Sequence, residues 1–231
     1  MNGPQRPGWL ASVRGVVFKE LLIEWQQRSR FVGLFFFSFA VLLMVAFAMP
    51  NTQVLSDIGG GALWLGLLLA SARSLDASFV VELENGALEG LTLWPVPSGA
   101  LFYGKAIANA LILLLVAASL TPLCVALYNV PSLARLDQLA LVLILGCTGL
   151  AAPGTIAAAL TAQARAASAL LPLLYFPLVV PVIMAASRAT TLAFEGDPMR
   201  QVDDWLLILG GFNVIHWATG GLLFARVIDE G

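Results

Sequence analysis

Long apolar runs alternate with short polar segments over most of the chain. Six runs stand out, at residues 31–49, 58–72, 106–128, 138–161, 166–187 and 205–225. An α-helix needs roughly 20 residues to cross the hydrocarbon core of a bilayer, and these runs come near that length, although the second is short. None of the runs contains Asp, Glu, Lys or Arg within these limits. The pattern predicts an all-α membrane protein whose six transmembrane helices form one domain over residues 31–226.

The segment before the first run has a different pattern. Residues 9–30 mix apolar and charged side chains, and Trp9, Val13, Val17 and Leu21 recur every four positions, as one face of a helix requires. Glu20 and Glu24 fall beside that face. We interpret the segment as an amphipathic helix that lies at the membrane interface, within an N-terminal cytoplasmic segment of residues 1–30. The alternative is a helix surrounded by solvent. These charges do not form the pattern of a cleaved secretory signal.

The composition supports a membrane protein. Hydrophobic residues make up 59% of the chain and charged residues 11%, and the mean hydropathy is +0.89. Soluble domains carry about 25% charged residues, so this chain has too few polar side chains to cover a surface in water. The net charge of −2 offers no basic surface for nucleic acid. Cys124 and Cys147 lie in separate apolar runs and are typical of packing residues rather than of a redox pair or a zinc site.

The basic residues predict the orientation. With the N-terminus inside, nine basic residues fall on the cytoplasmic side and three on the outer side, which agrees with the positive-inside rule. The cytoplasmic set is Arg6, Arg14, Lys19, Arg28, Arg30, Arg73, Lys105, Arg165 and Arg226, and the outer set is Arg135, Arg188 and Arg200. Both termini, including a tail at residues 227–231, are therefore expected in the cytoplasm. The outer segments are expected at residues 50–57, 129–137 and 188–204.

The six runs contain little that could carry chemistry. Charged residues inside a bilayer mark ion paths and proton relays, so their absence argues against an ion-coupled transporter and against an intramembrane protease. His216, in the sixth run, is either an axial haem ligand or a hydrogen-bonded packing residue. The chain lacks the G-x-x-x-x-G-K-[ST] phosphate loop. We therefore expect no catalytic residue and no metal site, and any ATP must be hydrolysed by another chain.

The most distinctive polar segment is the predicted cytoplasmic loop, residues 73–105. Glu82 and Glu84 lead to Gly86, which reads as a helix end followed by glycine. Leu88, Glu89 and Leu91 then begin a second short turn, and Pro95 and Pro97 enforce an extended break. A short acidic and apolar helix of this kind can dock in a groove of a partner protein. The alternative is an ordinary solvated loop.

Prolines interrupt the fourth and fifth runs. Pro153 and Gly154 should kink the fourth helix, and Pro177 and Pro181 share one face of the fifth. These helices could line a path or act as a hinge, and a static packing irregularity accounts for the pattern equally well.

Two stretches resemble the CcmB family, haem exporter protein B of cytochrome c maturation. They are ENGALEGLTLWPVPSGALFYGKAIA, at residues 84–108, and the run from Leu143 to Met184 with its Pro-Gly turn and its proline-rich half. The similarity extends from about Phe18 to Arg226. It implies a six-span permease of an ATP-binding-cassette (ABC) complex in the bacterial inner membrane.

The resemblance also implies partners and a division of labour. A CcmA-type ATPase would hydrolyse ATP, and a CcmC-type haem-handling protein, a CcmD-type small membrane protein and the haem chaperone CcmE would complete the system, with this chain as a homodimer. It implies that this chain binds no cofactor and that ATP hydrolysis drives release of the haem-loaded chaperone, and it leaves open whether haem passes through this chain as cargo. The residues expected to couple to the ATPase are Glu82, Glu84, Gly86, Leu88, Glu89, Leu91 and Pro95. The rival interpretations are an ABC exporter for lipid or drug and a passive scaffold of the haem-handling complex.

Overall fold

The computed structural model describes residues 8–26, 28–49, 52–84, 97–130, 135–162, 167–197 and 199–229. These ranges contain seven helices and no strand, which confirms the all-α class. The helices are α1 (Trp9–Gln26), α2 (Arg28–Ala48), α3 (Thr52–Glu84), α5 (Ser98–Leu127), α6 (Leu136–Ala162), α7 (Ala167–Glu195) and α8 (Gln201–Asp229).

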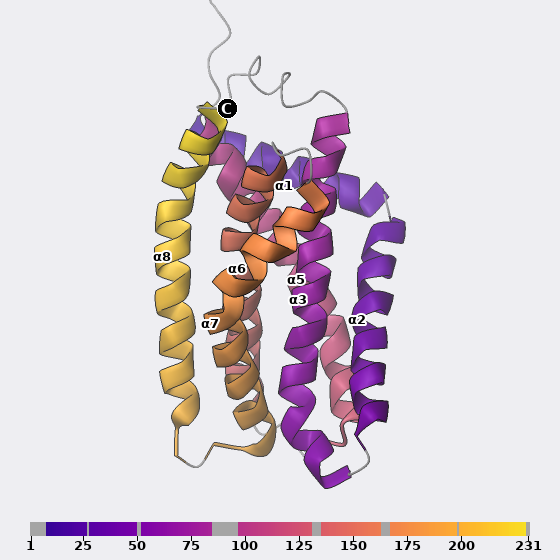
Figure 1. Cartoon of the computed structure of the whole chain (residues 1–231). Coiled ribbons are helices and arrows are strands. Elements are labelled where there is room, and N and C mark those ends of the chain that lie inside the picture. Colours follow the sequence, from indigo (N-terminus) through magenta and orange to yellow (C-terminus); the bar gives the residue numbers. More distant parts are fainter. Residues whose placement is uncertain are drawn as a thin grey trace, which may run out of the picture.

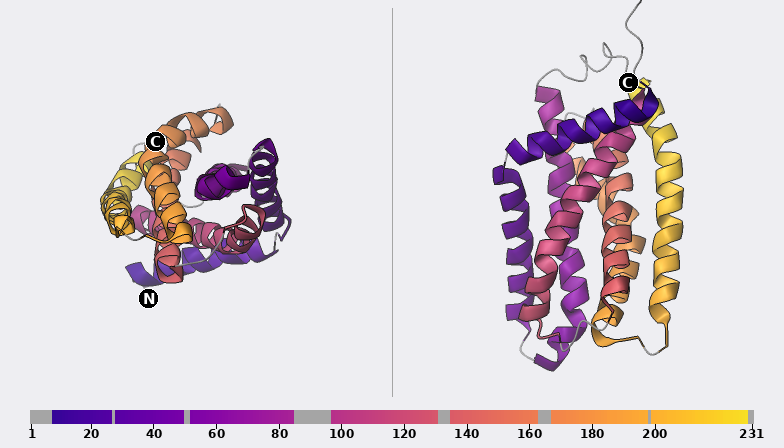
Figure 2. Two further views of the ribbon diagram at one scale, coloured as in Figure 1. Left: turned by 90° about the horizontal axis from the view of Figure 1, so that it is seen from below. Right: turned by 180° about the vertical axis from the view of Figure 1, so that it is seen from behind.

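Six of these helices are long and apolar enough to cross a membrane, as expected. Figure 1 shows α2, α3, α5, α6, α7 and α8 running up and down as neighbours, while α1 lies across one end of the bundle. The centre is α6, which packs against α3, α5, α7 and α8. The two edges are α2 and α8, which lie far apart when the bundle is seen along its axis (Figure 2). The protein is thus a six-helix transmembrane bundle with one crossing helix.

Several helices extend beyond their predicted limits and carry charges into the spans, as α3 and α5 illustrate. The apolar part of α3 runs from Val54 to Ser78 and that of α5 from Gly99 to Leu127. The expectation of uncharged spans is therefore wrong, because the second span contains Asp57, Arg73 and Asp76 and the third contains Lys105. The sequence limits were cut at the first charge, whereas a helix continues wherever its charged side chains find partners. The guanidinium of Arg73, for example, lies 5.4 Å from the centre of the Phe37 ring.

The predicted polar segments are correspondingly shorter. Residues 73–84 are the last turns of α3 and residues 98–105 the first turns of α5, so only the intervening residues separate the two helices. At the opposite end, α3 already begins at Thr52, and most of the expected outer loop at 188–204 is helical. There α7 ends at Glu195 because Gly196 adopts the left-handed conformation with φ 87°, which favours glycine.

Small residues let α6 lie close to its neighbours. A Cβ atom at Gly146 would fall 2.0 Å from Cη2 of Trp64, and one at Gly154 would fall 2.3 Å from Cδ1 of Leu75. Membrane helices pack through such positions because lipid supplies little hydrophobic force between helices. Buried hydrogen bonds add to this packing, such as the 2.8 Å bond from Trp64 Nε1 to Thr190 Oγ1. The α3, α6 and α7 helices therefore form the tightly packed middle of the bundle.

Candidate functional site

The end of the bundle that carries α1 also carries the predicted coupling segment. Glu82 and Glu84 lie in the last described turn of α3, which continues from the second span. After the connection, α5 begins at Ser98 directly behind Pro97, whose backbone is extended with ψ 133°. The other five predicted coupling residues, Gly86, Leu88, Glu89, Leu91 and Pro95, lie outside the described residues. The structure thus describes where the coupling segment leaves and re-enters the bundle.

The crossing helix α1 packs against the start of α5. Figure 2 shows α1 lying transversely over α5 at this end. A Cβ atom at Gly104 would stand 2.5 Å from Cβ of Val16, so glycine is what allows the two helices to approach this closely. Next to this contact the rings of Trp9 and Tyr103 meet edge to face at 5.6 Å. The crossing helix is therefore anchored directly on the first turns of α5.

The packed face of α1 includes most of the predicted one, since Val17 and Leu21 are half-buried, and it also includes two carboxylates. Val13 is buried, but Trp9 is 46% exposed. Glu20 and Glu24, which we expected beside the apolar face, point toward the bundle, and Glu24 is buried. Apolar side chains also cover the outer face, including Leu10, Phe18, Leu22 and Trp25. The carboxylate of Glu20 turns inward because α5 presents a buried cation to α1.

That cation is Lys105, which sequence analysis missed as a site residue. Its side chain is 0% exposed, and its Nζ lies 3.1 Å from Oε1 of Glu20. The same ammonium donates to the Ser78 carbonyl oxygen at 3.3 Å and to the Ser78 hydroxyl at 3.2 Å. Lys105 thereby joins α1, α3 and α5 at one point. Extending the third predicted helix toward the N-terminus from Ala106 would have included Lys105, since the residues on either side of it are apolar or small.

Polar contacts continue from this point along the inner half of α3. Ser78, Ser74 and Ser71 follow one another at helical spacing. Ser74 donates to Asn109 Oδ1 of α5 at 3.4 Å, and the Ser71 hydroxyl lies 2.8 Å from the Tyr175 hydroxyl of α7. The same face of α3 therefore contacts α5 near the end of the bundle and α7 deeper inside.

The structure does not bring the two predicted proline sets together. Pro153 and Gly154 are buried in α6, where Gly154 faces Leu75 and Tyr175. Pro177 and Pro181 are exposed on the outer face of α7. Figure 1 shows α7 changing direction over its first half. Prolines lie in this part of the helix, and a proline bends a helix because it cannot donate the regular backbone hydrogen bond. A hinge in these helices stays a prediction.

The surroundings of His216 are those of a packing residue. Its Nδ1 lies 2.9 Å from the carbonyl oxygen of Phe212, one turn earlier in α8. The imidazole also stacks on the Phe212 ring at a centroid distance of 3.9 Å. Within the described ranges, no group of three or more His, Cys, Asp or Glu side chains could hold a metal ion.

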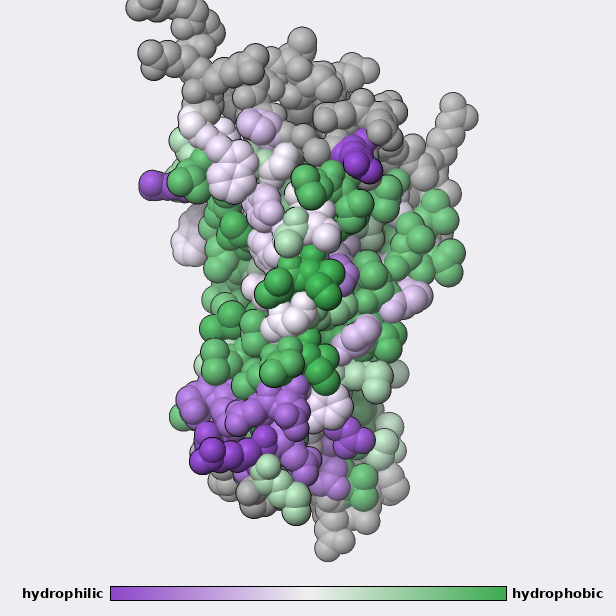
Figure 3. Space-filling view, turned by 90° about the vertical axis from the view of Figure 1, so that its left-hand side faces the viewer, coloured by the Kyte–Doolittle hydropathy of each residue, from purple (hydrophilic) through white to green (hydrophobic). Residues whose placement is uncertain are grey.

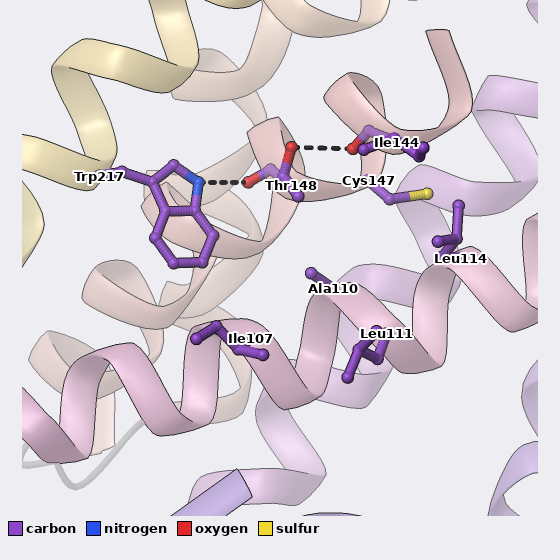
Figure 4. A pocket seen from close by; sticks show the side chains of 8 residues that line it. All are labelled: Ile107, Ala110, Leu111, Leu114, Ile144, Cys147, Thr148 and Trp217. Atoms are coloured by element: carbon purple, nitrogen blue, oxygen red, sulfur yellow. Dashed lines mark hydrogen bonds between the residues drawn. The ribbon is translucent and has the colours of Figure 1, made fainter. Parts of the chain in front are cut away.

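A small groove opens between α5, α6 and α8 (Figure 4). Its volume is about 160 Å³, and its lining is apolar. Known ligand pockets measure roughly 300–1,000 Å³, so this groove is smaller than a drug-sized ligand needs. Its most polar wall is closed, because the Trp217 indole donates to the Thr148 carbonyl oxygen at 3.3 Å. The groove thus offers an apolar lining to a slim apolar group.

The outer surface has the distribution expected of a membrane protein. On the face shown in Figure 3, apolar side chains cover the middle of the molecule and hydrophilic ones gather at the lower end, where α7 leads into α8. Exposed polar residues there include Arg200, Gln201, Asp203 and Asp204. This is the end opposite to α1, to the end of α3 and to the start of α5 (Figure 1).

Comparison with known proteins finds similarity to a single protein family over most of the chain. The family model described as CcmB protein matches residues 12–229. Heme exporter protein B of Rhodobacter capsulatus is 36% identical over 165 residues, which cover 71% of this chain and 75% of the relative. Heme exporter protein B of Pseudomonas aeruginosa is 31% identical over 176 residues, 76% of this chain and 78% of the relative. The same protein of Escherichia coli K12 is 32% identical over 181 residues, 77% and 79% of the two chains.

Proposed function

The chain belongs to the CcmB family, and from that premise we propose that it is the membrane subunit of a bacterial haem export system. The observation that carries the proposal is the match over residues 12–229, which spans α1, all six membrane helices and both ends of the α3–α5 connection. We place the protein in the inner membrane as a multi-pass subunit with both termini in the cytoplasm. The nine-to-three distribution of basic residues supports this orientation.

The energy for the work comes from a partner in this proposal. The chain has no phosphate-binding loop of the P-loop type. A CcmA-type ATPase therefore binds and hydrolyses ATP, and this chain receives the resulting movement. The receiving segment is the α3–α5 connection with the last turn of α3, because both lie at the end of the bundle assigned to the cytoplasm. Glu82, Glu84 and Glu89 face basic groups of the ATPase, Gly86 permits the sharp turn, and Leu88 and Leu91 fill an apolar groove before the break at Pro95.

The remaining partners follow from the family. The subunit pairs with a second copy of itself and works with a CcmC-type haem-handling protein, a CcmD-type small protein and the haem chaperone CcmE in cytochrome c maturation. ATP hydrolysis is coupled to haem handling and to release of the haem-loaded chaperone. The engaged imidazole of His216 supports action on haem-handling partners rather than haem binding at this histidine.

The test is reconstitution of this subunit with the CcmA-type ATPase of the same organism. The double variant Leu88→Ala with Glu89→Ala should insert normally but lose binding and stimulated ATP hydrolysis. Truncating a central pair of interface residues typically costs about 2 kcal/mol or more, so the apparent affinity should fall roughly 30-fold. The measurements are co-purification and the ATP hydrolysis rate as the subunit is titrated.

The matched control changes a leucine and a carboxylate at the opposite end. The double variant Leu136→Ala with Asp137→Ala removes exposed side chains at the start of α6 and should leave both readouts unchanged. Unchanged co-purification and ATP hydrolysis in the Leu88 and Glu89 variant would refute the coupling assignment. Normal cytochrome c assembly in a deletion strain would refute the haem role and favour another cargo.

A further inference from the structure

We propose that the ion pair between Lys105 and Glu20 is a latch, which ties the crossing helix α1 to α3 and α5 where the coupling connection leaves the bundle. Through this latch α1 moves together with the connection. This inference rests on the proposed function, since it states how movement received by the connection reaches the bundle. Lys105 acts here as a positioning residue that touches neither ATP nor cargo.

The first argument is the cost of the buried charge. Lys105 is 0% exposed and lies inside a helix that spans the membrane. Desolvating such a charge is expensive, and an apolar side chain of similar volume would usually serve stability equally well or better. Ionisable residues inside membrane helices are accordingly rare and commonly functional. The position of Lys105 therefore calls for a role beyond packing.

The second argument is the number of elements that meet at one atom. Nζ of Lys105 belongs to α5, contacts Oε1 of Glu20 in α1 at 3.1 Å and contacts both oxygens of Ser78 in α3 at 3.2–3.3 Å. Ser78 lies six residues before the end of α3, and Lys105 lies seven residues after the start of α5. The contact thus closes the base of the coupling connection and attaches α1 to it.

The third argument is that α1 is also held along the part that precedes Glu20. Val16 packs on Gly104, where an added Cβ would come within 2.5 Å. Toward the start of α1, Trp9 meets Tyr103, and Tyr103 in turn stacks on Trp217 of α8 at 6.1 Å and donates to its carbonyl oxygen at 2.9 Å. A displacement of the connection is therefore passed to α1 and across to α8, at the far edge of the bundle.

The latch can be tested without the ATPase through the accessibility of α1. Ser12 is 6% exposed on the packed face of α1, so a cysteine in its place reports whether α1 leaves the bundle. In detergent-solubilised full-length protein, Lys105→Met combined with Ser12→Cys should react with a water-soluble maleimide at least fivefold faster than Ser12→Cys alone. Lys19→Met is the matched control, because Lys19 also contacts Glu20, at 3.4 Å, from a 48% exposed position. Equal reactivity in the Lys105 and Lys19 variants overturns the latch.

The coupling role is tested in the complex with the CcmA-type ATPase. The Lys105→Met subunit should still co-purify with the ATPase. It should stimulate ATP hydrolysis about tenfold less at saturation, while the subunit concentration that gives half of the maximal stimulation should change little. A loss of co-purification in parallel with the rate would overturn the coupling role.

A double variant separates coupling from the cost of breaking this buried ion pair on one side. Glu20→Gln alone removes the carboxylate that lies 3.1 Å from Nζ of Lys105, and Glu20→Gln with Lys105→Met removes both members of the pair. If the pair only satisfied a buried charge, the double variant would recover stimulation, and the proposal would fail. The latch predicts that the double variant stays uncoupled and that position 12 stays reactive. Should the unmodified subunit give no stimulation, the proposed function fails, and maleimide reactivity alone decides the latch.

Discussion

At the scale of single residues, the bundle depends on side chains whose neighbours leave no room for change. Gly146 is the clearest case, because the indole of Trp64 occupies the space that a side chain would need. That indole cannot easily swing away, since its Nε1 donates to Thr190 at 2.8 Å. Glycine in a helix is normally an entropic liability, so the contact with Trp64 explains its presence.

We expect Gly146→Ala to destabilise the protein. Overpacking of a well-packed interior typically costs about 1–3 kcal/mol, which should lower the melting temperature in detergent by several degrees. Gly211→Ala is the matched control, because no atom lies within 4 Å of its added Cβ in α8. That variant should be as stable as the parent protein or slightly more stable. Equal melting temperatures for the two variants would show that Trp64 can move aside.

At the scale of secondary-structure elements, the ends of helices decide the connections. The turn between α7 and α8 is held by Asp197, whose Oδ2 accepts a hydrogen bond from the backbone N–H of Val202 at 2.7 Å. Desolvation raises the pKa of this carboxyl, but backbone N–H groups of Val202, Gln201 and Met199 outweigh it and lower the pKa below its ordinary value. The ionised form therefore stabilises the start of α8.

This cap should depend on pH with a definite sign. Because the folded-state pKa of Asp197 is lowered, its contribution is fully present above the ordinary carboxyl pKa and is lost as the pH falls through the lowered value. Asp197→Ala should remove it at all pH values and speed hydrogen exchange of the Val202 amide. Asp204→Ala, an exposed carboxylate in the first turn of the same helix, should change that amide far less. Similar exchange in the two variants would contradict the cap.

At the scale of the whole molecule, the two ends of the bundle have different tasks. One end gathers α1, the end of α3, the start of α5 and the end of α8, and at the other end α7 leads into α8 (Figure 1). The basic residues divide nine to three between the sides that the sequence assigns to these ends. We expect the end with α1 to face the cytoplasm.

Cysteine labelling checks this orientation. Asp137→Cys places a thiol at an exposed outer position, and Lys19→Cys places one at an exposed position on α1. A membrane-impermeant maleimide should label position 137 in spheroplasts and position 19 only in inverted vesicles. The native Cys124 and Cys147 are buried and should stay unlabelled. The reverse labelling pattern would place the coupling connection outside the cytoplasm and rule out its contact with an ATPase.

The sequence by itself determined the class of protein and the number of spans. These follow from a local rule, since a bilayer requires about 20 apolar residues per helix. Their limits could not be predicted in the same way. Charged residues such as Arg73 and Lys105 remain helical because of contacts with residues distant in the chain.

Only the tertiary structure decided which polar residues act together. Glu20 and Lys105 are separated by 85 positions, and nothing local to either one indicates the other. The same holds for the proline sets, which look alike in sequence but lie buried in α6 and exposed on α7. The reason is physical: hydropathy and helical period depend on neighbours along the chain, whereas a buried charge is stabilised by whichever side chains the folded bundle brings within about 3 Å.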